Sequence, residues 1–189
     1  MSTTKLIEFE NGVPANHHEF HNSWAGAARI WGSLYDHYLK DSSKPFDNWL
    51  TSTARPGDRR LWDLAKSDAL SMAERAVHAF TFDYFIVRRE NLERFSADLR
   101  TFAELHPAPG KVDHLPEWAD VFEHSAYEAI ALHATSVTEN PWYGFDEETD
   151  EPIPYDLNER NLHTEVYQWL SEIDGPPSDP DENTEAPMK

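Results

Sequence analysis

The chain has no cysteine, no long hydrophobic run and almost no positive charge in its last two-fifths. Without cysteine it cannot form disulfides, thiolate metal sites or a cysteine nucleophile, and it fits a reducing compartment. No window approaches the roughly 18 apolar residues of a membrane-spanning helix, and the N-terminus lacks the apolar segment of a secretory signal. We therefore expect a cytoplasmic protein without membrane association.

The sequence also lacks the short motifs of common catalytic and cofactor-binding sites. It contains no G-x-G-x-x-G, no Walker A loop, no G-x-S-x-G and no E-x-x-H of the di-iron bundles. Serine, histidine and aspartate all occur, but their spacing does not suggest a catalytic triad. We expect no catalytic residue, no cofactor and no bound metal, and so a protein that is not an enzyme.

An alternative remains, because three pairs of potential metal ligands are each four residues apart: His17 and His21, Glu74 and His78, and Asp120 and His124. On helices the members of each pair would share one face, as in a metal-dependent helical-bundle enzyme. Glu19, however, stands at the wrong position between the first two histidines for a zinc-protease motif. The two carboxylate–histidine pairs can equally stabilise their own helices by roughly 0.2–0.5 kcal/mol.

Apolar residues recur at helical spacing in five stretches: residues 23–40, 58–80, 90–105, 116–132 and 158–173. Asn22 or Ser23 can cap the first helix. The second stretch forms one helix or two, because residues 71–74 (SMAE) have the form of a capping box. These patterns predict a mainly α fold, a compact bundle of about five amphipathic helices.

Three shorter segments have strand character, namely residues 5–9, 81–87 and 132–138. If they pair, the fold is α+β, with a small sheet beside the helices. We expect one globular domain over residues 1–173. Residues 174–189 have no periodicity, four prolines and many acids, and so predict a disordered acidic tail.

The negative charge is concentrated at one end of the chain. Residues 112–189 hold 20 acidic residues against Arg160 and Lys189, which gives −18 of the total net charge of −19. Residues 142–159 (WYGFDEETDEPIPYDLNE) combine seven carboxylates with four large aromatic rings. Rings of this size anchor a segment to the domain or to a partner. If extended, the segment rises about 3.3 Å per residue, close to the roughly 3.4 Å between phosphates along one DNA strand.

We therefore predict a partner-binding acidic surface made of Trp142, Tyr143, Phe145, Asp146, Glu147, Glu148, Asp150, Glu151, Tyr155, Asp156, Glu159 and Glu165. It would engage a basic protein surface, most plausibly that of a nucleic-acid-binding protein, as an inhibitor or nucleic-acid mimic. Direct nucleic-acid binding is not expected, because the arginines near residues 55–60 and 88–94 alternate with acids. A plain interaction subunit whose charge keeps it soluble is a further alternative.

The overall character of the chain is also informative. Small, acidic, cysteine-free and aromatic-rich chains without a catalytic motif resemble phage or prophage accessory proteins, including anti-restriction and anti-CRISPR inhibitors. This resemblance covers the whole chain and no particular motif, so it assigns no residue. It implies a protein that blocks a nucleic-acid-handling complex.

Overall fold

The computed structural model describes residues 3–44, 46–108, 110, 112–134, 140–146, 148–149 and 151–175. In these residues the chain has an α+β fold with seven α-helices, a five-stranded mixed sheet and a separate two-stranded hairpin. The helices are α1 (Ala27–Leu34), α2 (Trp49–Thr53), α3 (Arg60–Asp63), α4 (Met72–Ala79), α5 (Leu92–Leu105), α6 (Leu115–His124) and α7 (Val166–Asp174). The strands are β1 (Thr3–Glu10), β2 (Val13–His21), β3 (Phe85–Arg88), β4 (Ala129–Ala134), β5 (Tyr143–Phe145), β6 (Pro152–Pro154) and β7 (Thr164–Glu165).

The large sheet has the strand order β2-β1-β4-β3-β7, in which only the β3–β7 pair is parallel. Asn11 and Gly12 join β1 to β2 and have φ angles of 53° and 85°, the left-handed conformations that a tight hairpin turn requires. The three segments with strand character all contribute to this sheet, although residues 135–138 lie outside the described residues. The α+β alternative is therefore confirmed.

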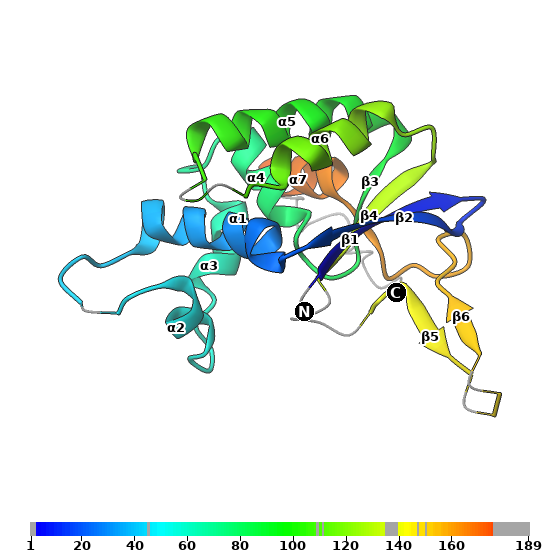
Figure 1. Cartoon of the computed structure of the whole chain (residues 1–189). Helices are drawn as coiled ribbons and strands as arrows, with labels where there is room; N and C mark the ends of the chain where they lie inside the picture. The colour runs from blue at the N-terminus through cyan, green and yellow to red at the C-terminus, as the bar shows by residue number, and fades with distance from the viewer. Residues whose placement is uncertain are drawn as a thin grey trace, which may run out of the picture.

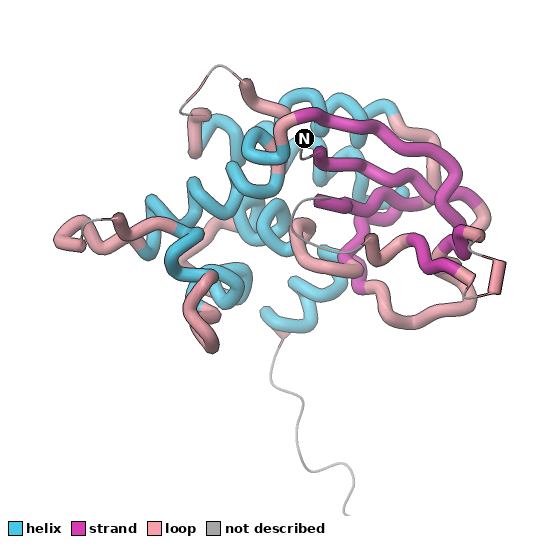
Figure 2. Tube along the Cα trace, turned by 60° about the horizontal axis from the view of Figure 1, so that its bottom comes forward, coloured by secondary structure: helices cyan, strands magenta, loops and turns pink. Residues whose placement is uncertain are grey.

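The three inner strands β1, β4 and β3 are buried on both faces, and alternate residues of these strands enter two different cores, whereas the edge strand β2 is largely exposed. Leu6, Val87, Ile130 and Leu132 join the large core with the helices, which lie on one side of the sheet (Figure 1). The other face is covered by the segment that follows β4, as the turned view also shows (Figure 2). There a second core is formed by Ile7, Phe9, Ile86, Ala129, Ala131, Trp142, Tyr155 and Leu157. The helical side supplies most of the buried apolar surface, and the second core attaches the acidic part of the chain.

The predicted helix over residues 116–132 is wrong in its second half. Helix α6 ends at His124, Ser125 is extended, and residues 129–134 (AIALHA) form β4. Alanine and leucine favour helix, but in this segment small and large residues alternate. Ala129 and Ala131 therefore face the second core, while Ile130 and Leu132 face the first.

The other helix boundaries also differ from the sequence prediction. The first helix starts after Gly26, which is its N-cap, and not at Asn22 or Ser23 as expected. The second stretch is divided into α3 and α4, and Ser71 forms the expected capping box at the break. Helix α7 starts only at Val166 and continues through Asp174, which pairs with Arg75 at 2.8 Å. The first residue of the predicted tail, Asp174, thus belongs to this helix. Residues 176–189 lie outside the described residues.

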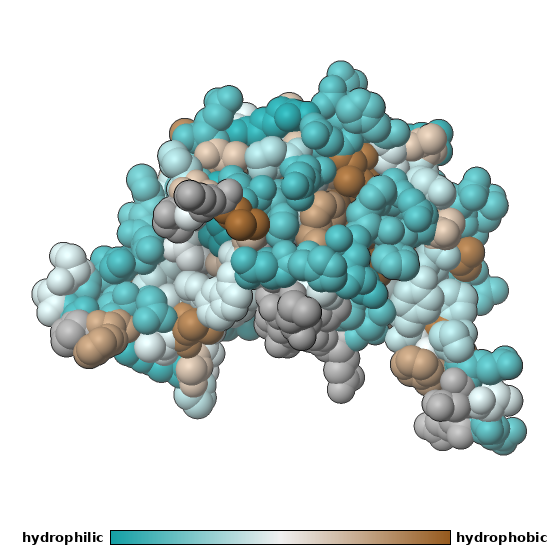
Figure 3. All heavy atoms as spheres, in the orientation of Figure 1, coloured by the Kyte–Doolittle hydropathy of each residue, from teal (hydrophilic) through white to brown (hydrophobic). Residues whose placement is uncertain are grey.

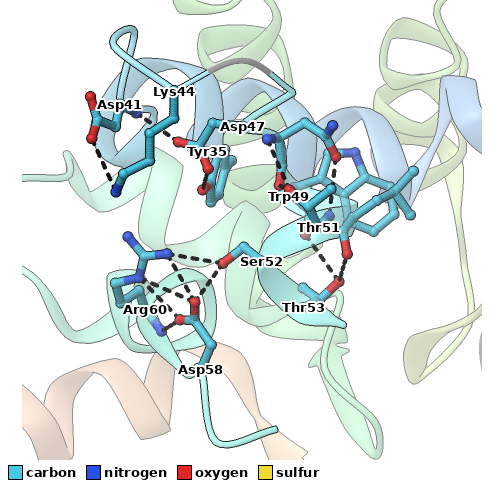
Figure 4. Close-up of polar contacts among 12 residues, drawn as sticks. Tyr35, Asp41, Lys44, Asp47, Trp49, Thr51, Ser52, Thr53, Asp58 and Arg60 are labelled. Atoms are coloured by element: carbon cyan, nitrogen blue, oxygen red, sulfur yellow. Dashed lines mark hydrogen bonds and ion pairs between the residues drawn. The ribbon is translucent and has the colours of Figure 1, made fainter. Parts of the chain in front are cut away.

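Polar contacts, drawn in Figure 4, fix the conformation of the segment between α1 and α3. The hydroxyl of Tyr35 donates to Asp47 at 2.8 Å, and the guanidinium of Arg60 forms an ion pair with Asp58 at 2.9 Å. Trp49, at the start of α2, packs its ring against Trp31 with centroids 5.4 Å apart. This segment is therefore attached to the helical core through Trp49.

His78 on α4 predicts a pH dependence of stability. Its side chain is fully buried, neither ring nitrogen has a hydrogen-bond partner among the described residues, and burial lowers its pKa to about 3. The unfolded chain gains this proton below about pH 6.5, whereas the folded chain does not, so the free energy of unfolding falls as the pH falls. Between pH 7 and pH 5 this residue alone should remove about 2 kcal/mol.

Urea unfolding at both pH values measures this effect. We expect His78→Leu to reduce the loss between pH 7 and pH 5 by about 2 kcal/mol, because the variant has no proton to gain. The matched control is the exposed His17, whose replacement by glutamine should leave the loss unchanged. An equal loss in the His78→Leu variant would show that His78 is not the group responsible.

Candidate functional site: an acidic hairpin on an aromatic base

The acidic hairpin, residues 142–155, rests on a fully buried tryptophan. Trp142 has 0 % of its surface exposed and packs its ring against Phe9 of β1 at 5.3 Å. Its indole N–H donates to the carbonyl of Leu132 on β4 at 2.9 Å, which satisfies its only polar atom. Ala129 and Ala131 belong to the same core and are small enough to let the ring lie against the sheet. Trp142 thus fixes the hairpin to the domain.

Tyr155 fixes the other end of the hairpin in the same core. Its ring is 1 % exposed and contacts Trp142 edge-on at 5.3 Å, and its backbone N–H donates to the carbonyl of Trp142 at 2.9 Å. The hydroxyl of Tyr155 accepts from the N–H of Leu162 at 3.1 Å. Both strands therefore leave the sheet side by side from a packed base.

The hairpin projects away from the helices, at the lower right of Figures 1 and 3. Strands β5 and β6 pair antiparallel, with Phe145 opposite Pro152, and the N–H of Asp146 then donates to the carbonyl of Glu151 at 2.9 Å. Asp146 also accepts from the N–H groups of Thr149 and Glu148 at 2.8 and 2.9 Å. These two bonds lower the pKa of the Asp146 carboxyl and order the described part of the turn.

Two apolar side chains remain exposed on the hairpin. Phe145 is 66 % exposed and Ile153 is 41 % exposed. Because Phe145 pairs with Pro152 and Ile153 pairs with Gly144, they lie on opposite faces of the two-stranded ribbon. Each face of the projecting hairpin therefore offers an apolar contact beside the acids.

The described carboxylates of this region have no cationic partner. Within the residues that the structure describes, no ion pair involves Asp146, Glu148, Glu151, Asp156 or Glu159. Several acids elsewhere are paired, for example Asp113 with Arg29, Asp174 with Arg75, and Asp120 with Arg100. The charge of the hairpin and the following loop is thus not neutralised from within the described chain.

The acids that follow the hairpin divide into two groups. Asp156 and Glu159 lie in the loop between β6 and β7, which we call the acidic loop. This loop is attached to the β1–β2 turn, where the N–H of Leu157 donates to the carbonyl of Gly12 at 2.7 Å. Glu165 is 8 % exposed, caps α7 by accepting from the N–H of Gln168 at 2.7 Å, and also accepts from Asn91. Glu165 therefore has a structural role and contributes nothing to an acidic face.

The other predicted site residues have these positions. Tyr143 is half-buried against the second core, and Glu147 and Asp150 lie outside the described residues. Two acids missed by the sequence reasoning, Glu10 and Glu128, lie near the acidic loop at the β1–β2 turn. Glu128 accepts from the N–H of Gly12. Both belong to strands or strand entries, so their position depended on the sheet topology.

The three pairs of potential metal ligands do not converge. His17 and His21 are exposed on β2, Glu74 accepts from Tyr38 and lies 2.7 Å from His106 Nε2, and the carboxylate of Asp120 pairs with Arg100. Among the described residues, no group of three or more histidine, aspartate or glutamate side chains is placed to hold a metal ion. A helix long and apolar enough to span a bilayer is likewise absent from the described part of the chain.

Comparison with known proteins does not assign the site. No family model, curated protein or solved structure matches this chain. Its function must therefore be argued from the hairpin itself.

Proposed function

We propose that the chain is a non-catalytic binding protein whose acidic hairpin and acidic loop engage a basic surface of a nucleic-acid-handling protein. The observation that carries this proposal is the combination of an ordered, projecting hairpin with carboxylates that have no cationic partner among the described residues. On this proposal, these carboxylates attract a cationic partner, because complementary charges steer the encounter of two proteins.

The arrangement favours a positively charged cleft on the partner. The described carboxylates of Asp146, Glu148 and Glu151 lie at the turn between β5 and β6 and not along an extended strand, so the phosphate-like rise expected of an extended segment is not present. The projecting acidic tip would instead enter a cleft that normally holds phosphate groups. The exposed ring of Phe145 (66 % exposed) would add an apolar contact, since aromatic side chains are enriched at the centres of interfaces. The net charge of −19 would accelerate the encounter at low salt and repel nucleic acid itself.

The resemblance to phage accessory proteins indicates which biological role this proposal implies. A protein that occupies a nucleic-acid site would inhibit the complex that owns the site, as an anti-defence protein does. On this proposal, the chain acts in the cytoplasm, without cofactor, as an inhibitor or nucleic-acid mimic.

A capture experiment with matched variants tests the proposal. The untagged chain is immobilised and exposed to the heparin-binding fraction of a bacterial lysate, which is enriched in nucleic-acid-handling proteins. We expect captured proteins to be released by duplex DNA and by added salt, because both compete for the same cationic site. Neutralising the tip acids should reduce capture at least about tenfold; the changes are Glu147→Gln, Glu148→Gln, Asp150→Asn and Glu151→Gln. Asp146 is kept because it orders the turn.

The control removes the same number of charges elsewhere on the surface, by Asp68→Asn, Glu93→Gln, Glu104→Gln and Glu172→Gln, all at exposed positions. It should capture as the natural chain does. Equal capture by the tip variant, or captured proteins that duplex DNA does not displace, would contradict the proposal.

A further inference from the structure

A second feature, which shares no residue with the acidic hairpin, is a cavity of about 440 Å³ with aromatic walls. Its lining includes the rings of Trp31, Trp62, Phe82, Phe85 and Trp169, which we call the aromatic pocket. They come from α1, α3, the turn between α4 and β3, β3 itself and α7. Small-molecule sites have volumes of roughly 300–1,000 Å³, so the cavity is large enough for a ligand.

The rings of the aromatic pocket stand nearly perpendicular to one another. Phe82 makes angles of 75° with Trp62 and 83° with Trp169, and Trp31 makes 81° with Trp62. A planar base would need two nearly parallel rings to stack between, and no such pair occurs among these contacts. Walls at right angles instead present ring faces and edges around a compact, rounded group.

Contacts behind the cavity hold two of its aromatic walls in position. The indole N–H of Trp31 donates to the hydroxyl of Thr81 at 2.8 Å, and Trp62 is stacked on the buried ring of His78 at 6.1 Å and 19°. Since burial lowers the pKa of His78 to about 3, this imidazole is neutral near pH 7 and does not repel a cation on the other side of Trp62.

The charges at the mouth also decide between ligands. Arg59 is offset by Asp63, with Nε and Oδ1 3.8 Å apart. Asp83 lines the cavity and is exposed, and its carboxylate also interacts electrostatically with His133 of β4. Lys66 lines the cavity, is exposed and has no ion pair within the described residues. The formal charges at the mouth sum to zero, and it is the aromatic faces of the lining that favour a cation over an anion.

We propose that the aromatic pocket binds an organic cation of the quaternary or methylated ammonium class. The ring faces of Trp62, Phe82 and Trp169 would hold the methyl groups by cation–π attraction, and the carboxylate of Asp83 would face the charge from the mouth. The site is independent of the acidic hairpin, since the two share no residue.

Titration calorimetry with choline and tetramethylammonium tests this proposal. We expect saturable binding of choline with a Kd below about 1 mM, and at least about tenfold weaker binding of 3,3-dimethylbutan-1-ol, its uncharged isostere. Trp169→Leu and Phe82→Leu should each weaken choline binding at least about tenfold. Trp24→Leu, at an exposed ring outside the pocket, is the matched control and should change nothing.

Two surface variants keep the test valid if the aromatic replacements do not fold. Asp83→Asn should weaken choline binding about threefold, and Lys66→Gln should tighten it by a similar factor, because each changes one charge at the mouth. The proposal is overturned by no saturable binding at about 20 mM choline, by equal binding of the uncharged isostere, or by unchanged binding in both surface variants.

Discussion

Replacing Trp142 with alanine should lower the free energy of unfolding by about 3–5 kcal/mol and should abolish partner capture by the acidic hairpin. The ring is completely buried, and its removal leaves a cavity between β1 and β4 that the small Ala129 and Ala131 cannot fill. It also removes the indole hydrogen bond to Leu132, which leaves a carbonyl without that donor. Because the strands of the hairpin start at this ring, the loss of stability and the loss of function have one cause.

Urea unfolding and the capture assay measure the two effects. Trp24→Ala is the matched control, because its ring is 56 % exposed. Trp24→Ala should lower the free energy of unfolding by less than about 1 kcal/mol and leave partner capture unchanged. Full capture by a folded Trp142→Ala variant would separate the hairpin from its base and contradict the account.

In a separate variant, replacing Glu74 with alanine should lower the free energy of unfolding by about 3–5 kcal/mol. The carboxylate is 4 % exposed and accepts from the backbone N–H of Ser71 at 2.8 Å and from the hydroxyl of Tyr38 at 2.7 Å. His106 Nε2 lies 2.7 Å from Oε1 of Glu74, the same oxygen that accepts from Tyr38. One side chain thus joins the start of α4, the π-helical turn Tyr35–Leu39 and the end of α5. Its removal leaves these buried groups without their acceptor.

The same residue gives a pH signature. Burial would raise the pKa of the Glu74 carboxyl, but hydrogen bonds from Ser71, His106 and Tyr38 outweigh burial and lower it to about 2. The stabilisation is therefore complete above about pH 4.5 and is lost as the pH falls toward 2. Unfolding of Glu74→Gln between pH 5 and pH 3 should show a smaller loss than the natural chain, and Glu104→Gln, at an exposed acid on α5, should not. An unchanged loss in Glu74→Gln would mean that its carboxylate is not held as described.

The fold was predictable where local signals suffice. Helix α5 has a long amphipathic repeat that ends before Pro107, and the capping box at Ser71 marks the start of α4. Strand β4 was predicted as helix because its alanines and leucine favour helix locally, whereas its pairing with β1 and β3 depends on residues 41 to 130 positions away. The two-residue strand β7 pairs in parallel with β3 and has no local signal.

The site was predictable in composition but not in detail. The sequence indicated that rings anchor the acidic segment, but it could not separate Trp142 and Tyr155, which are buried, from Phe145, which is exposed. That difference depends on the space beside Ala129 and Ala131, and so on the sheet. Glu165 was counted with the acidic surface because the helix was expected to start before it, whereas Glu165 is in fact the cap.

The most direct test of the account is an NMR measurement of backbone order in the isolated protein, since the proposal requires carboxylates that are held in a fixed array before any partner arrives. For the amides of Gly144, Phe145 and Ile153 we expect order parameters near about 0.85, equal to those of β4. Values below about 0.6 at these amides, with β4 still rigid, would mean that the acidic hairpin is a loose appendage and that the proposed recognition has no preformed surface.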